Sequence, residues 1–167
     1  MLHFRALIAA ALLALGTLTA CGFQLRGARP LPFETLYINM PDTSELAAAI
    51  KRTIRASGIT RVPDTREGAQ AILEPMGDSK EKIILSLNSA GRVREYQLRQ
   101  KFFFRVHDGK GGELLAPAEI ILTRDITFND AQLLAKEQEE ALLYRDMQND
   151  LVQQILRRIA AAKPVAR

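Results

Sequence analysis

The chain has 167 residues, of which 47% are apolar and 25% are charged, as is typical of one globular domain. Its net charge of +4 is too small to indicate a nucleic-acid partner, and its single cysteine, Cys21, excludes an intrachain disulfide and a cysteine-based metal site. The two histidines, His3 and His107, exclude a histidine-rich metal centre, so no cofactor is expected.

The first twenty residues have the pattern of a lipoprotein signal peptide. Residues 6–18 form an apolar run that is too short to span a bilayer, which needs about 20 residues. Leu18-Thr19-Ala20-Cys21 then matches the bacterial lipobox. We expect cleavage before Cys21, with diacylglycerol on its thiol and an acyl chain on its amino group. Gly22, in place of Asp, favours the outer membrane; the alternative is an ordinary signal peptide or a first helix with a buried cysteine.

After a tether over residues 21–32, a single domain is expected over residues 33–162, followed by a frayed C-terminus at 163–167. The alternating residues 35–40 predict a strand, and residues 59–62 are a candidate for a second, short one. Between them, Asp42 as N-cap with Glu45 as its capping-box partner predicts a helix. Leu46, Ile50 and Ile54 would form its apolar face, and Gly58 would end it.

Residues 71–128 have the pattern of a β-meander, with turns at 88–91 and 108–112. One face is apolar, as in Ile83-Leu85-Leu87 and in the alternating aromatic and aliphatic residues of 96–106, whereas the other is polar. Asn129 with Gln132 predicts a capping box for a long helix over residues 131–162, which Pro164 ends. Its apolar stripe is Leu143, Met147, Leu151, Ile155 and Ile159. This order predicts an α+β fold, with two helices on one face of a mostly antiparallel four-stranded sheet.

Few residues suggest catalysis. Asp-Gly-Lys-Gly-Gly at 108–112 lacks the spacing of a phosphate-binding loop and is interpreted as a hairpin turn. Glu137, Glu139 and Glu140 are interpreted as solvated residues in the first turns of the long helix. His107 is the only available histidine base in the mature chain, and no Gly-x-Ser-x-Gly elbow is present. We therefore do not expect an enzyme.

Basic residues are more informative. Arg92 and Arg94 follow the turn at 88–91, and Lys136 lies near the start of the long helix. Arg99, Lys101 and Arg105 continue along the polar face of the strand at 92–107. Cations on a rigid sheet suit phosphorylated or carboxylated glycolipids. The alternative is a solvated face that carries ordinary charge.

Four stretches together resemble the LptE family of lipopolysaccharide-assembly lipoproteins. They are CGFQLRG at 21–27, EYQL at 95–98, RDITFND at 124–130 and AKEQE at 135–139. The resemblance implies a non-enzymatic subunit with two helices on a four-stranded sheet. It also implies that this subunit lies as a plug inside the LptD barrel of the outer membrane, assists its assembly and binds lipopolysaccharide for delivery to the outer leaflet.

The resemblance also assigns roles to residues. It implies that Cys21 is the lipid anchor and Lys136 a lipopolysaccharide contact, with Arg92 and Arg94 adding positive charge near the hairpin tip. A barrel lumen is largely polar, so the polar residues Gln97, Arg99 and Lys101 are expected to face it.

Two other classes remain open. One is a peripheral outer-membrane lipoprotein that binds an anionic envelope polymer without a barrel partner. The other is an envelope hydrolase that uses His107 or the acidic cluster at 137–140.

Overall fold

The computed structural model describes residues 30–129 and 132–163. Cys21, the signal peptide, most of the expected tether and residues 164–167 lie outside the described residues. The elements in chain order are β1 (Leu36–Ile38), α2 (Glu45–Ser57), β2 (Ala71–Leu87), β3 (Val93–His107), β4 (Glu113–Thr127) and α3 (Leu133–Ala160).

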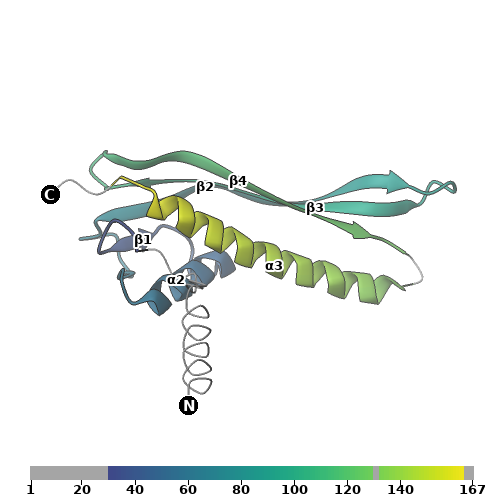
Figure 1. Cartoon of the computed structure of the whole chain (residues 1–167), viewed down its shortest axis with the longest axis horizontal. Coiled ribbons are helices and arrows are strands. Elements are labelled where there is room, and N and C mark those ends of the chain that lie inside the picture. Colours follow the sequence, from purple (N-terminus) through teal and green to yellow (C-terminus); the bar gives the residue numbers. More distant parts are fainter. Residues whose placement is uncertain (1–29, 130–131, 164–167) are drawn as a thin grey trace, which may run out of the picture.

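The four strands form one sheet in the order β1-β2-β3-β4. β1 pairs in parallel with β2 through the α2 crossover, whereas β2, β3 and β4 are antiparallel neighbours. Both helices lie on the same side of the sheet, and α3 runs along much of its length (Figure 1). The predicted α+β fold is confirmed.

The core lies between the sheet and the helices. Alternate positions of β3 point toward the helices, so Leu98, Phe102, Phe104 and Val106 are all fully buried. The rings of Phe102 and Phe104 stack with centroids 5.4 Å apart. The helices add apolar side chains that recur every three or four residues, and these are Leu46, Ile50 and Ile54 from α2 and Met147, Leu151, Ile155 and Ile159 from α3.

The N-cap of α2 is Ser44, so the prediction of Asp42 was wrong. The Ser44 hydroxyl accepts the Ala47 amide at 3.2 Å, because Ser44 has an extended backbone one residue before the helix. Asp42 lies outside the first turn and forms an ion pair with Lys51 at 3.3 Å. The predicted C-cap is confirmed, since Gly58 has a φ of 67° in the left-handed region.

The predicted bounds of the long helix were also too wide. α3 begins at Leu133, and its N-cap, Gln132, makes no side-chain capping bond. The Gln132 amide donates to the Asn129 carbonyl, and Gln132, not Asn129, is the N-cap residue. At the other end, the amides of Ala161 and Lys163 donate to Arg158 and Leu114. The candidate strand at 59–62 is reduced to a single bridge between Thr35 and Arg61.

Candidate functional site at the hairpin end of the sheet

The turn at 88–91 is built by one side chain. The Asn88 carboxamide oxygen accepts the amides of Ala90 and Arg92, each at 3.0 Å, and Gly91 takes a φ of 74°. These bonds hold Arg92 in the turn, so β3 begins only at Val93. The expectation that Arg92 and Arg94 project from one strand was therefore wrong: Arg94 alone lies on β3.

Lys136 reaches the same end of the sheet as the hairpin strands. Its ammonium group lies 3.0 Å from the Thr127 hydroxyl, and Thr127 is paired with Glu95 across β3 and β4. The Phe128 amide donates to the carbonyl of Arg94 at 2.7 Å. The folded chain thus brings the expected cationic residues to one end of the molecule (Figure 1).

Lys136 and Arg94 differ in whether they already form an ion pair within the chain. Lys136 forms an ion pair with Glu139 at 2.8 Å, and only 15% of its side chain is exposed. The side chain of Arg94 is exposed and forms no ion pair with any residue in the described ranges. Arg94 is therefore better placed than Lys136 to meet an external anion.

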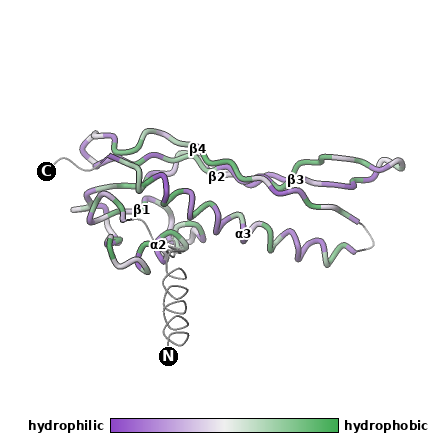
Figure 2. The backbone as a smooth tube through the Cα atoms, in the orientation of Figure 1, coloured by the Kyte–Doolittle hydropathy of each residue, from purple (hydrophilic) through white to green (hydrophobic). Residues whose placement is uncertain are grey.

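The same end carries exposed apolar side chains. The exposed fractions are 55% for Ile84, 46% for Leu85 and 56% for Leu87 on β2, and 74% for Leu134 near the start of α3. The prediction that Ile83, Leu85 and Leu87 share the dry face was wrong. Lys82 pairs with the fully buried Leu98 and faces α3, so its neighbour Ile83, opposite Gln97, lies on the other side of the sheet. The hairpin also extends beyond Leu133, the first residue of α3 (Figures 1 and 2). Alternation in the sequence located this strand but did not show which of its faces the helices cover.

A contact cluster that the sequence did not reveal attaches α3 to the hairpin strands. The Lys82 ammonium forms an ion pair with Glu140 at 2.6 Å and lies 4.4 Å from the centroid of the Tyr96 ring. Tyr96 meets Phe128 edge to face, with centroids 5.4 Å apart. Glu139 and Glu140 are thus ion-paired, which corrects the interpretation that this acidic cluster is only solvated.

The side of the sheet opposite the helices carries hydrogen-bonded polar side chains along the middle of β3, beside apolar ones such as Ile121, which pairs with Lys101 and is 51% exposed. Lys101 lies 2.9 Å and Arg99 3.8 Å from the carboxylate of Glu81, and Gln97 donates to Asp125 at 3.1 Å. All three side chains expected to face a barrel therefore lie on this uncovered surface. The charges of Arg99 and Lys101 are partly balanced by Glu81 on the flanking strand, and the neutral Gln97 is hydrogen-bonded to Asp125, so the surface presents hydrogen-bonding groups.

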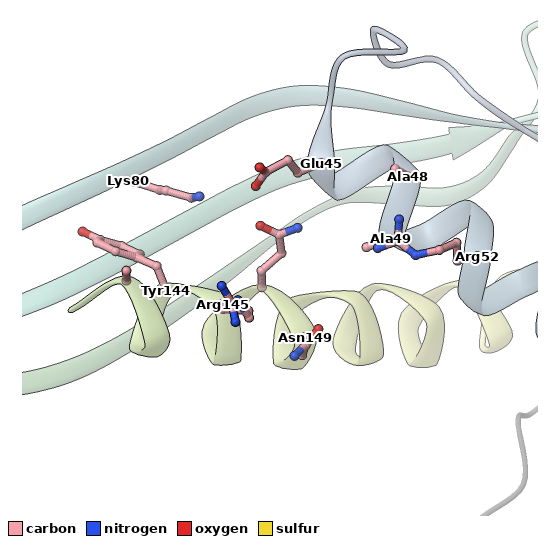
Figure 3. Close-up of a pocket in the computed structure, with 10 residues that line it drawn as sticks. Glu45, Ala48, Ala49, Arg52, Lys80, Tyr144, Arg145 and Asn149 are labelled. Atoms are coloured by element: carbon pink, nitrogen blue, oxygen red, sulfur yellow. The ribbon is translucent and has the colours of Figure 1, made fainter. Parts of the chain in front are cut away.

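A groove separates the two helices (Figure 3). It has a volume of about 560 Å³ and is lined by one face of α2, one face of α3 and one lysine of β2. These are Glu45, Ala48, Ala49, Arg52, Lys80, Ala141, Tyr144, Arg145, Gln148 and Asn149. Sequence reasoning missed it, although the alanines in α2 are its sequence signal.

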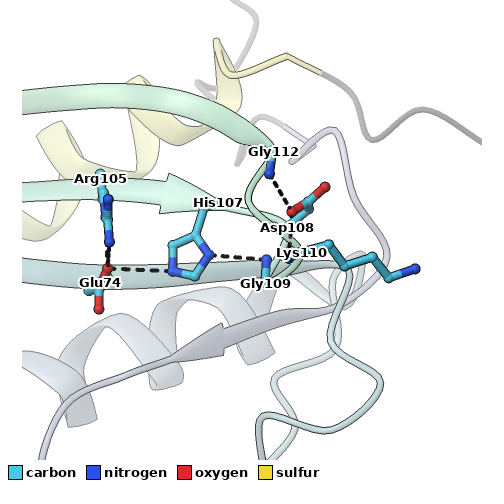
Figure 4. A network of polar contacts seen from close by, with 7 residues as sticks. All are labelled: Glu74, Arg105, His107, Asp108, Gly109, Lys110 and Gly112. Carbon is cyan, nitrogen blue, oxygen red and sulfur yellow. Dashed lines mark hydrogen bonds and ion pairs between the residues drawn. The ribbon is translucent and has the colours of Figure 1, made fainter.

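His107 belongs to a polar network at the opposite end of the sheet (Figure 4). Its Nδ1 accepts the Gly109 amide at 3.0 Å, and its Nε2 lies 3.5 Å from Glu74. A hydrogen bond from Arg105 holds the pKa of Glu74 below its ordinary value.

The adjoining turn at 108–112 has the hairpin geometry that the sequence predicts. The Lys110 and Gly112 amides both donate to the Asp108 carboxylate and lower its pKa. His107 is thus held between a backbone amide and a carboxylate, with no nucleophilic side chain hydrogen-bonded to it among the described residues. Nor do three or more His, Cys, Asp or Glu side chains gather into a metal-binding group within the described ranges.

The fold is similar to that of solved lipoprotein structures. A lipoprotein B from Nitrosomonas europaea is 42% identical, with a TM-score of 0.73 over 84% of this chain and 91% of that one. The rare lipoprotein B from Shewanella oneidensis is 28% identical, with a TM-score of 0.66 over 76% of this chain and 94% of that one. Both match the helix-on-sheet architecture described above, so the chain has the fold of a small α+β lipoprotein.

The particular family follows from the sequence comparisons. The model of the family LptE, described as lipopolysaccharide-assembly, matches residues 33–159. The LPS-assembly lipoprotein LptE of Yersinia enterocolitica is 28% identical over 154 residues, which are 88% of this chain and 72% of that protein. The LPS-assembly lipoprotein LptE of Pectobacterium atrosepticum is 26% identical over 142 residues, which are 83% of this chain and 76% of that protein. The chain belongs to the LptE family, whose role in lipopolysaccharide assembly is accessory and non-enzymatic.

No helix within the described residues is long and apolar enough to cross a membrane.

Proposed function

We propose that this chain is the lipidated outer-membrane plug subunit that assists assembly of the LptD barrel and binds lipopolysaccharide for delivery to the outer leaflet. The observation that carries the proposal is the family match over residues 33–159. The lipobox that ends at Cys21 supports attachment to the membrane by diacylglycerol and an acyl chain.

The uncovered side of the sheet supports the plug role. A protein that fills a barrel lumen must present polar, hydrogen-bonding groups to a polar wall. Gln97, Arg99 and Lys101 provide such groups along the middle of β3. Because Arg99 and Lys101 both lie against Glu81, and Asp125 accepts a hydrogen bond from Gln97, these groups can be covered without leaving a charge that has no partner, which would be costly.

The hairpin end supports lipopolysaccharide binding. Lipopolysaccharide combines phosphorylated sugars with acyl chains, so its binder needs cations beside apolar surface. Arg94 and the exposed leucines of β2 and α3 offer both within one end of the molecule. Arg92 and Lys136 add positive charge there.

Affinity purification of the tagged, full chain from detergent-solubilised outer membrane tests the plug role. We expect LptD to co-purify, and photo-crosslinkers at Gln97, Arg99 and Lys101 to trap it or lipopolysaccharide. Exposed helix positions Gln138 and Gln153 serve as controls. Reaction at the helix positions alone would reverse the proposed orientation. Purification without any barrel would favour a peripheral lipoprotein that binds an envelope polymer.

Charge reversal tests the lipid site. Arg94→Asp with Lys136→Asp should weaken lipopolysaccharide binding at least tenfold while LptD still co-purifies. Arg66→Asp with Lys110→Asp makes the same charge change in exposed loops at the opposite end of the sheet and should leave binding intact. Equal loss in both variants would mean that only net charge matters, and unchanged affinity in the first variant would reject the site.

The anchor has a separate test. Cys21→Ser should abolish palmitate labelling and impair cleavage and localisation, because the modified thiol is then missing. Labelling that persists in this variant would rule out the lipobox assignment.

A further inference from the structure

The groove between α2 and α3 is lined by small residues on the α2 side, Ala48 and Ala49, and by one alanine, Ala141, on the α3 side. In α2 the lining positions are Glu45, Ala48, Ala49 and Arg52, and in α3 they are Ala141, Tyr144, Arg145 and Gln148. In both sets the residues are spaced i, i+3, i+4 and i+7, which places them on one face of each helix. Ala48 and Ala49 in the middle of the α2 face leave the space open, and longer polar side chains surround it (Figure 3).

The groove has an excess of positive charge. Arg52, Lys80 and Arg145 line it, against a single carboxylate from Glu45. Neither arginine side chain forms an ion pair or a hydrogen bond with any part of the chain that the structure describes, and Glu45 forms no ion pair there. Lys80 lies 5.6 Å from the centroid of the Tyr144 ring. The cations therefore remain available to an external anion.

Neutral groups in the groove indicate the rest of the ligand. Gln148 and Asn149 carry amides, which donate and accept hydrogen bonds and so match sugar hydroxyls. Tyr144 supplies a ring that is fixed in place, because its hydroxyl donates to the Glu81 carbonyl at 3.2 Å. The volume of about 560 Å³ lies within the range of small-molecule sites.

We infer that the groove between α2 and α3 binds an anionic saccharide, with Arg52, Lys80 and Arg145 on its phosphate or carboxylate and Gln148 and Asn149 on its hydroxyls. This site is separate from the hairpin end, since Arg145 follows Lys136 by nine residues, about 13 Å along the helix. The inference does not depend on the LptD partnership or on the lipid site proposed above.

Titration calorimetry on the purified full chain in non-ionic detergent tests the inference. The probe is glucose 6-phosphate, compared with glucose and with inorganic phosphate. We expect the sugar phosphate to bind at least tenfold more tightly than either control. Arg52→Gln with Arg145→Gln should raise its Kd at least tenfold. Arg66→Gln with Lys110→Gln removes two exposed loop cations elsewhere and should leave the Kd unchanged.

A second variant separates shape from charge. Ala141→Trp fills the groove at an exposed helix position without altering any charge, and should also raise the Kd at least tenfold. Thermal unfolding of each variant checks that the fold is retained. Arg92→Gln with Lys136→Gln should leave the Kd for glucose 6-phosphate unchanged, so failure of the lipid site and failure of the groove are distinguishable.

Further probes identify the source of the saccharide. Tighter binding of deacylated lipopolysaccharide oligosaccharide than of soluble peptidoglycan fragments assigns the groove to a glycolipid headgroup, and the reverse assigns it to a wall polymer. The inference is overturned if inorganic phosphate binds as tightly as the sugar phosphate, or if the groove variants bind normally. It is also overturned if a hexaglutamate peptide binds more tightly, which would indicate an acidic protein partner.

Discussion

Gln100 is a glutamine in the middle of the sheet, on the face that the helices cover. Only 1% of the residue is exposed, and its side-chain oxygen has no hydrogen-bond donor among the described residues. A buried, unsatisfied carbonyl costs about 1–3 kcal/mol. Gln100→Met keeps the length of the side chain and removes the polar atoms, so it should stabilise the protein by about that amount.

The expected shift in melting temperature follows from the size of the domain. With an unfolding entropy of about 2.1 cal/mol/K per residue over about 130 residues, 1–3 kcal/mol corresponds to a rise of about 4–11 °C. Differential scanning calorimetry of the full chain measures it. Gln97→Met is the matched control on the uncovered face; it loses the bond to Asp125 and should lower stability by up to about 1 kcal/mol. A Gln100→Met variant that is no more stable than the parent would refute the reasoning and show that the oxygen is satisfied in solution.

Phe102→Ala should destabilise the domain by about 3–5 kcal/mol in chemical denaturation, because this fully buried ring stacks on Phe104 and its loss leaves a cavity; a loss below 1 kcal/mol would mean that the core collapses around it. Gly58→Ala should cost about 1 kcal/mol in the same assay, since the cap needs a left-handed backbone. Arg105→Gln should raise the pKa of Glu74, measured by NMR titration of the carboxyl carbon. Because the parent pKa is lowered, the bond stabilises the fold at neutral pH, and the stability difference between parent and variant should vanish as the pH falls through the folded-state pKa of Glu74.

The pattern of apolar residues predicted the architecture because burial imposes a strict period. The alternation from 96 to 106 located β3 and its buried face, and the spacing of Met147, Leu151, Ile155 and Ile159 located the buried side of α3. Helix ends were harder. Asp42 and Ser44 are both good N-caps, and only the backbone conformation before Glu45 decides between them.

The candidate site was less accessible to sequence reasoning, because it depends on pairs of residues from distant elements. Nothing in the local sequence of Lys82 indicates that it meets Glu140, 58 positions later. The same is true of the contact between Lys136 and Thr127, which is made only when α3 folds back along β4. Arg99 and Lys101 on β3 share the carboxylate of Glu81 on the neighbouring strand, a pairing that the sequence of β3 alone does not show.

The two halves of α3 are attached to the sheet in different ways. From Met147 to Ile159 the helix buries apolar side chains completely, whereas the half before Met147 is attached through Lys136, Lys82 and the Tyr144 hydroxyl. Contacts of the second kind are single hydrogen bonds and a partly exposed ion pair, each of which contributes less than a fully buried apolar side chain. The C-terminal half of α3 is therefore held more strongly than its N-terminal half, and hydrogen exchange of the backbone amides should become faster from Ile159 toward Leu133. A partner that covers the hairpin end acts on the part of the molecule that costs least to rearrange, while the core continues to hold the fold.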